Sequence, residues 1–155
     1  MAIITATLNV SSADLTSNAL ALSKTMTMTK DTTSIAAGDG LEFSSGLIRR
    51  KYTAITEVDL VPTGLQAYGT PTASKAGKLY IKNTGSSSTD YISVGLGDAT
   101  GAEELDDGTS KITLGKLFGG DFMIIPYHGA ANVGDVLVKP STAEETTVEW
   151  MLFFE

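Results

Sequence analysis

Cysteine is absent from this sequence, and so is any long apolar segment. Extracellular domains of this size often depend on disulfides, whereas a protein of the cytoplasm has no need of them. The first residues contain no basic stretch followed by an apolar one, so we expect no signal peptide. The longest apolar runs fall far short of the roughly 18 residues that a membrane helix needs. These absences predict a protein that is made and folded in the cytoplasm and binds no membrane.

Charged residues are also few, at 19% of the chain, where soluble domains usually have about a quarter. Eleven Lys and Arg stand against 18 Asp and Glu, which gives a formal net charge of -7. The only basic run is Arg49-Arg50-Lys51. Nucleic-acid binding without sequence preference needs a dense basic surface, so we expect no nucleic-acid partner. The length of 155 residues and 42% hydrophobic content suffice for one domain with a real core.

Histidine occurs once, as His128. Jelly-roll enzymes of the cupin type build their metal sites from several histidines and a carboxylate, which one histidine without cysteine cannot supply. No Gly-x-Ser-x-Gly nucleophile elbow is present either. Gly129, directly after His128, indicates a turn at the end of a strand. We therefore expect no catalytic residues and no enzymatic activity.

An acidic segment runs from Asp98 to Gly108. Calcium requires six to eight converging oxygens, but the spacing here does not match the Asp-x-Asp-x-Asp-Gly pattern, which favours a solvated or partner-facing loop over a metal site. Gly115-Lys116 lacks the upstream glycines of a phosphate loop and predicts a bulge or turn. The sequence thus predicts no metal and no cofactor.

Threonine, glycine and serine are frequent, and apolar residues recur with period two between turn residues. Short strands at intervals of about ten residues predict an all-β fold, either an antiparallel β-sandwich or a jelly-roll-like fold. The predicted strands cover residues 25–29, 41–43, 47–61 (as strand pairs), 78–82, 91–96, 111–114, 122–127, 136–139 and 146–154.

Two of these strands carry further expectations. We expect 78–82 and 91–96 to pair as a hairpin, because Asn83-Thr84-Gly85 and a serine-rich turn separate them. The continuous apolar run at 122–127 predicts a strand that is covered on both faces.

Residues 1–24 have a weaker pattern, and we expect them to form an N-terminal arm outside a sandwich of residues 25–155. The arm is either extended or contains a short helix over 11–24. In the helical alternative, Leu15, Ala19 and Leu22 share one face.

The last strand is apolar on both sides. Trp150, Leu152 and Phe154 fall on one face, while Met151 and Phe153 fall on the other. Such a strand is either central in a layered core or half-buried by another subunit.

The second half of the chain, roughly residues 78–155, contains an ordered series of turn and strand motifs. They are a strand that ends in Asn83-Thr84, a β-branched strand at 91–95, a Gly119-Gly120-Asp121 turn into an Ile-Pro strand, and the aromatic strand 148–154. In this series the chain resembles the small β-sandwich structural proteins of tailed bacteriophages, particularly capsid decoration (cement) proteins.

The resemblance implies a virion protein that is assembled in the host cytoplasm and binds the outer capsid surface, where it reinforces the shell. Its partner would be the major capsid protein or another virion protein. It would be a homo-oligomer, with a trimer favoured, and its N-terminal arm would reach onto a neighbouring subunit. The residues that we expect at subunit or capsid contacts are Ile3, Ile4, Leu8, Leu15, Trp150, Leu152 and Phe154.

Two other functions stay open. A phage tail component, such as a tube, terminator or fibre-attachment protein, fits the same motifs. A carbohydrate-binding module would need exposed aromatic residues for stacking, and it normally comes with a secretion signal or a catalytic domain. Its candidate stacking residues are Tyr52, Tyr68, Tyr80, Tyr91 and Tyr127.

Overall fold

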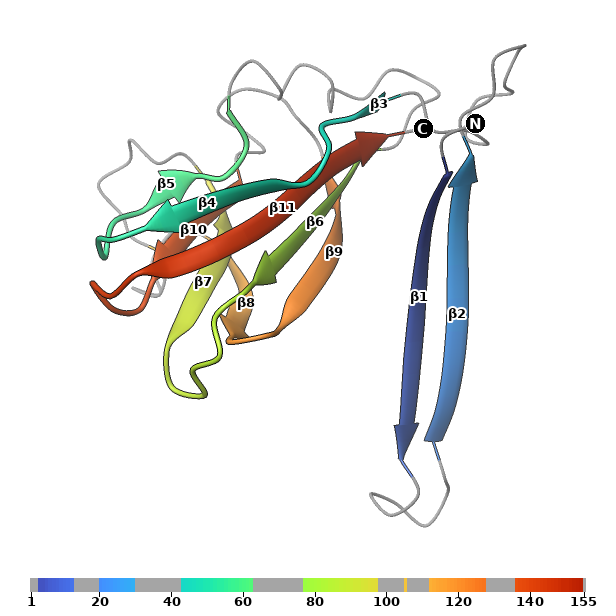
Figure 1. Cartoon of the computed structure of the whole chain (residues 1–155), viewed down its shortest axis with the longest axis horizontal. Coiled ribbons are helices and arrows are strands. Elements are labelled where there is room, and N and C mark those ends of the chain that lie inside the picture. Colours follow the sequence, from blue (N-terminus) through green and yellow to red (C-terminus); the bar gives the residue numbers. More distant parts are fainter. Residues whose placement is uncertain are drawn as a thin grey trace. The chain divides into compact units, whose positions relative to one another are not determined.

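A computed structural model describes residues 3–12, 20–29, 43–62, 77–97, 105, 112–127 and 136–154. All regular structure in these residues is β-strand (Figure 1), which confirms the all-β prediction. The chain divides into two compact units, Met1–Glu42 and Phe43–Phe154. The described residues include no helix long and apolar enough to cross a membrane.

The first unit contains a β-hairpin. Strand β1 (Ile3–Ser12) pairs antiparallel with β2 (Leu20–Thr29), from Ile3 opposite Thr29 to Ser12 opposite Leu20 (Figure 1, blue). The extended form of the predicted arm is therefore confirmed for these strands. The helix predicted over 11–24 is wrong at 11–12 and 20–24, and residues 13–19 lie outside the described part of the chain.

The failure of the helix prediction has a simple cause. From Leu20 to Met28 large apolar residues stand at every second position except at Lys24, separated by Ala, Ser and Thr, and this period is that of a strand. The helical pattern used only Leu15, Ala19 and Leu22. Strand β2 also crosses the predicted boundary between residues 24 and 25, whereas the two compact units divide between residues 42 and 43.

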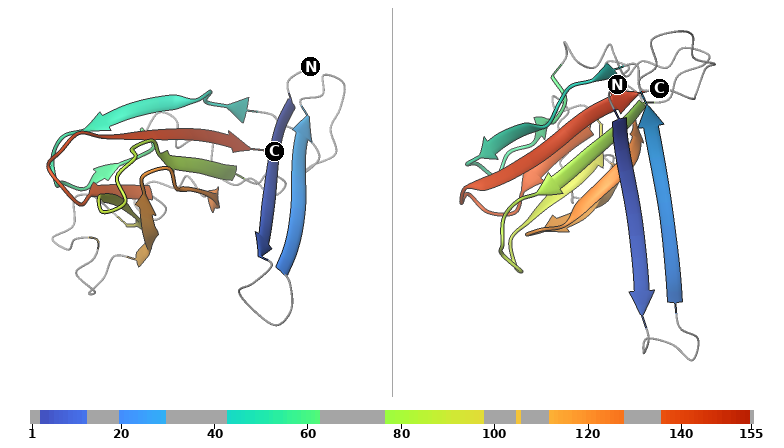
Figure 2. Two further views of the ribbon diagram at one scale, coloured as in Figure 1. Left: turned by 60° about the horizontal axis from the view of Figure 1, so that its bottom comes forward. Right: turned by 45° about the vertical axis from the view of Figure 1, so that its right-hand side comes forward.

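The second unit is an antiparallel β-sandwich of two sheets, which confirms that prediction (Figure 2). In the first sheet the order is β5 (Val58–Asp59), β10 (Val136–Pro140), β7 (Tyr91–Leu96) and β8 (Ile112–Phe118). In the second sheet it is β3 (Phe43–Ser44), β11 (Thr146–Phe154), β6 (Gly77–Asn83) and β9 (Phe122–Tyr127). Strand β4 (Ile48–Tyr52) also pairs with β11.

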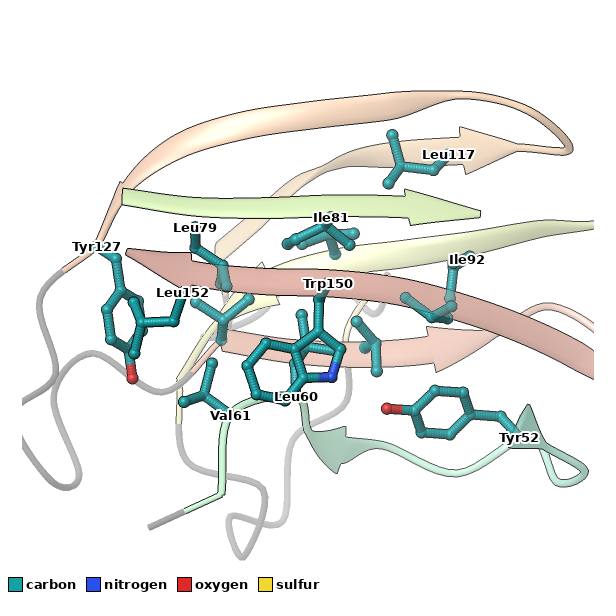
Figure 3. Close-up of a cluster of buried hydrophobic side chains, with 14 residues drawn as sticks. Tyr52, Leu60, Val61, Leu79, Ile81, Ile92, Leu117, Tyr127, Trp150 and Leu152 are labelled. Carbon is teal, nitrogen blue, oxygen red and sulfur yellow. The ribbon is translucent and has the colours of Figure 1, made fainter. Parts of the chain in front are cut away.

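The core lies between the two sheets, and burial alternates regularly along β6. In β6, Leu79 and Ile81 point inward and are buried, while their neighbours are half-buried. They meet Ile92 and Val94 of the first sheet, and Trp150 fills the centre (Figure 3). Burial of large apolar side chains stabilises a domain by about 1.5–3 kcal/mol each. The period-two pattern of the sequence is thus the direct cause of the sandwich.

One predicted pairing is wrong. The strands at 78–82 and 91–96 were expected to form a hairpin, but β6 pairs with β11 and β9, and β7 pairs with β10 and β8. Residues 84–90 therefore cross from one sheet to the other. Both strands are central and carry inward apolar residues, so neither needs the other as a hydrogen-bonding partner.

A second expectation fails at β9, which was predicted to be covered on both faces. This strand stands at the end of its sheet, and Phe122 and Ile124 are exposed. The bulge or turn predicted at Gly115-Lys116 is found one residue earlier. There, Val94 pairs with Gly115 and Gly95 with Thr113, so that Leu114 is the extra residue.

Candidate contact surfaces

The chemical groups singled out in the sequence lie largely outside the described residues. This is true of His128 and of the acidic segment 98–108 apart from Leu105. Leu105 is buried, and its backbone N–H donates a hydrogen bond to the Glu57 carboxylate. In the described part of the chain no three His, Cys, Asp or Glu residues are grouped as metal ligands. The absence of a metal and of a cofactor stays a prediction.

The carboxylates of β11 and its adjoining loop form ion pairs across strands. Arg49 pairs with Glu149, which is buried, and Lys51 pairs with Glu145 at 2.5 Å. Burial raises the pKa of the neighbouring Tyr80, and the negative charge of Glu149 raises it further. The two ion pairs hold β4 against β11 and its adjoining loop, which is a structural role.

Two shallow depressions occur among the described residues. One of about 260 Å³ lies beside Asn83, Ser87 and Thr142, and one of about 230 Å³ lies beside Ile55, Tyr91 and Lys139. Sites for small molecules usually enclose about 300–1,000 Å³ and are mainly apolar. Both depressions are smaller than that, so neither has the size of a typical small-molecule site.

The largest group of exposed apolar residues in the described part of the chain lies on β8 and β9, the last strands of the two sheets. The three-residue connection Gly119–Asp121 joins them, so both edges lie on the same side of the sandwich. Five of the exposed large apolar residues stand on these two strands, and we call them the rim: Ile112, Leu114, Phe118, Phe122 and Ile124. Natural proteins usually protect edge strands with charged residues. Here β9 contains no charged residue and β8 contains only Lys116, and such an apolar composition is typical of a contact surface.

The corner between β8 and β9 is held by Asn83. Its side-chain amide donates a hydrogen bond to the Leu117 carbonyl at 3.0 Å and accepts one from the Gly85 N–H at 2.9 Å. Its backbone N–H donates to Asp121 and its carbonyl accepts from Gly120. A buried polar residue with all of these partners fixes local geometry. Asn83 therefore sets the direction in which the chain leaves β8 and enters β9.

Gly119 makes a second close approach at this corner. Its N–H donates to the Ser87 carbonyl at 2.9 Å. A Cβ atom at this position would lie 2.6 Å from the Ser87 nitrogen and 2.7 Å from the Ser86 carbonyl carbon. Only glycine allows the two backbones to come this close.

Aromatic residues of the neighbouring strands contact two of the rim residues. Phe118 meets Tyr91 edge to face with ring centres 5.4 Å apart, and Phe122 lies 6.3 Å from the Tyr80 ring. The Lys116 ammonium lies 4.3 Å from the centre of the Tyr91 ring and donates a hydrogen bond to its hydroxyl. These rings hold Phe118 and Phe122 in defined positions, which lowers the entropy that a partner would have to remove on binding.

Three of the four predicted contact residues of the arm lie in β1. Leu8 is 48% exposed, which is compatible with a contact role. Ile3 and Ile4 belong to the described strand, although only their backbone is described. Leu15 lies outside the described residues.

The predicted contact role of Trp150 and Leu152 in the last strand is wrong. Trp150 is 1% exposed and Leu152 is 0% exposed, because β11 is central in its sheet, with β3 and β4 on one edge and β6 on the other. Their apolar surface is already covered by the core (Figure 3), so we no longer assign them to a contact. Of the two alternatives for this strand, the central position is the correct one. The backbone of Phe154 continues β11.

The rim was missed from the sequence, although one signal was present. Phe122-Met123-Ile124-Ile125 is apolar at both odd and even positions, and a solvent-facing edge strand would alternate with polar residues. From the sequence alone, this run predicts a strand that is covered on both faces. The same pattern is also produced by an edge strand whose outer face meets a partner.

The candidate stacking residues for sugars are only partly accessible. Tyr52 and Tyr127 are buried in the core, and Tyr80 and Tyr91 are half-buried. Tyr68 lies outside the described residues. The described tyrosines therefore do not form an open aromatic platform.

No protein-family model, no curated protein and no solved structure matches this chain.

Proposed function

We propose that this chain is a non-enzymatic structural protein of a virion, which binds the outer surface of the capsid and stabilises the shell through protein contacts. The observation that carries the proposal is the rim. An apolar surface on two adjoining sheet edges fits a protein partner that covers it.

The motifs of the resemblance add support, because they coincide with the residues that build the rim. Asn83 and the turn from Gly119 to Asp121 form the corner, and the strand from Phe122 to Pro126 carries two of the exposed residues. The motifs that carry the resemblance therefore lie in the part of the sandwich that includes the rim.

Charge supports a protein partner over the packaged nucleic acid. The chain has a net charge of -7, which disfavours DNA binding. On the rim strands β8 and β9 the only charged residue is Lys116, which lies against Tyr91. Since little charge has to be desolvated, most of the binding free energy would come from apolar burial.

Binding to shells tests the proposal. Full-length chain is mixed with shells assembled from the major capsid protein of the virus that encodes it, and the shells are pelleted. We expect saturable co-sedimentation. Ile112→Asp should weaken it by about 30-fold, because an unpaired charge in an apolar contact costs roughly 2 kcal/mol.

Ile55→Asp is the matched control. It is the same substitution at a residue of similar exposure, 51% against 62% for Ile112, on the loop between β4 and β5 instead of the rim. This variant should bind like the wild type. A wild-type chain that stays in the supernatant, or equal binding by both variants, would contradict the proposal. Recovery with tails instead of shells would assign the chain to the tail.

A further inference from the structure

The β1–β2 hairpin has two unlike faces. Residues that stand opposite each other in the register share a face, as do residues two apart in one strand. One face therefore holds Ile4, Ala6, Leu8 and Val10 of β1 with Leu20, Leu22, Met26 and Met28 of β2, interrupted only by Ser12 and Lys24. We call it the apolar face.

The opposite face is polar. It holds mostly Thr, Ser and Asn, and cross-strand hydrogen bonds link Thr7 with Thr25 at 3.2 Å and Ser23 with Asn9 at 2.6 Å. These four side chains are exposed. The hairpin thus has one polar face that can remain in water and one apolar face that is more stable when another surface covers it.

A two-stranded hairpin alone is marginally stable at best in water, and a third strand or a packing partner is needed to keep it folded. Leu8, on the apolar face, is 48% exposed in the single chain. The hairpin is therefore expected to gain stability when another surface covers this face.

We propose that the apolar face of the hairpin packs against the hairpins of further copies of this chain. The charge distribution favours this occupant. The chain carries -7 overall, so its copies repel each other, and this repulsion is weakest where the surfaces in contact contain no acidic residue. Neither β1 nor β2 contains Asp or Glu, and Lys24 is their only charged residue. Apolar faces of identical copies associate by burying apolar surface, which needs no opposite charges.

Lys24 makes the proposal testable against an acidic partner. It lies opposite Leu8 on the apolar face. When copies associate through this face, their lysines approach one another and repel. Removing the charge should then strengthen association, whereas it would weaken the binding of an acidic partner protein.

Sedimentation velocity of the full-length chain, without shells, over a wide range of protein concentrations tests the inference. The wild type should be an oligomer that dissociates on dilution. Met26→Asp should shift dissociation to at least about tenfold higher concentration, because it places a charge in the apolar face. Thr5→Asp is the matched control on the polar face and should leave the mass unchanged. Near-ultraviolet circular dichroism from Trp150 should confirm in each case that the sandwich is folded.

Lys24→Leu should shift dissociation to lower concentration by several-fold. A wild type that is monomeric at all concentrations would overturn the inference. So would a weaker association of Lys24→Leu, or equal effects of Met26→Asp and Thr5→Asp. Shell binding is measured separately through the rim, so either proposal can fail without the other.

Discussion

Asn83 stands at the end of β6, where its side-chain amide bridges the Leu117 carbonyl and the Gly85 N–H. Asn83→Ala leaves both backbone groups without this partner. We expect the free energy of unfolding to fall by about 1–3 kcal/mol, since a buried polar group that loses its partner costs that much. Urea unfolding measures the change.

The neighbouring residue supplies the control. Thr84 donates from its hydroxyl to the Thr147 carbonyl at an exposed site, so Thr84→Ala should cost less than about 1 kcal/mol. If both variants lose the same stability, Asn83 does not hold the corner in the way described.

Tyr52 predicts how stability depends on alkaline pH. Burial raises the pKa of its phenol above the ordinary 10.0, and the positive charge of Arg50 opposes part of that increase. The folded state therefore keeps its proton at a pH where the unfolded chain has released it. The contribution of Tyr52 to the free energy of unfolding should be constant below pH 10 and fall as the pH rises through the folded pKa.

Denaturant unfolding between pH 8 and about 12 measures this loss. Tyr52→Phe cannot ionise and should lose less stability above pH 10 than the wild type. Tyr80, whose pKa is also raised, accounts for part of what is left. Parallel loss in the wild type and in Tyr52→Phe would show that Tyr52 does not contribute.

At the scale of the element, the strands were largely predictable and their partners were not. The alternation that buries Leu79, Ile81 and Asn83 is visible in the sequence, and β6 was found within one residue at each end. The hairpin expected between β6 and β7 failed because a seven-residue connection can turn within one sheet or cross between two. The choice depends on contacts such as Gly119 with Ser87, which join residues 32 positions apart in the sequence.

Two glycines on the β8–β9 element give a matched prediction. Gly119→Ala places a methyl group against the backbone of Ser86 and Ser87 and should destabilise the fold by about 1–3 kcal/mol. At Gly115 a Cβ atom would meet nothing within 4 Å, so Gly115→Ala should be neutral or slightly stabilising. Thermal or urea unfolding compares the two. Equal stability would contradict the close approach at the corner.

The contact surfaces were the least predictable elements. Sequence alternation gives the face of a residue, but it does not give the position of its strand within a sheet. Trp150 and Phe122 are both large and aromatic, yet one lies at the centre of the second sheet and the other at its edge. The position follows from strand order, which long-range pairing determines.

At the scale of the whole molecule, the chain consists of a sandwich and a separate hairpin unit. Composition predicted the all-β class, and the weak pattern of the first residues predicted an arm. The length of the arm was underestimated, because the clear alternation at 25–29 was assigned to the sandwich although these residues pair with β1.

The two proposals assign a different contact to each of these units. Hairpin faces would join copies of the chain, and the rims of the joined sandwiches would bind the shell. Several weak rim contacts held in one oligomer bind much more tightly than one, because each further contact forms at high effective concentration.

The most direct test of the account is the temperature at which shells come apart, measured by scanning calorimetry with and without the chain. In the proposed function, the partner is the shell built from the major capsid protein of the encoding virus. We predict that saturating wild-type chain raises this temperature, that Ile55→Asp does the same, and that Ile112→Asp has little effect at equal concentration. A shell whose disruption temperature is unchanged when the chain is bound would contradict the claim that the protein stabilises it.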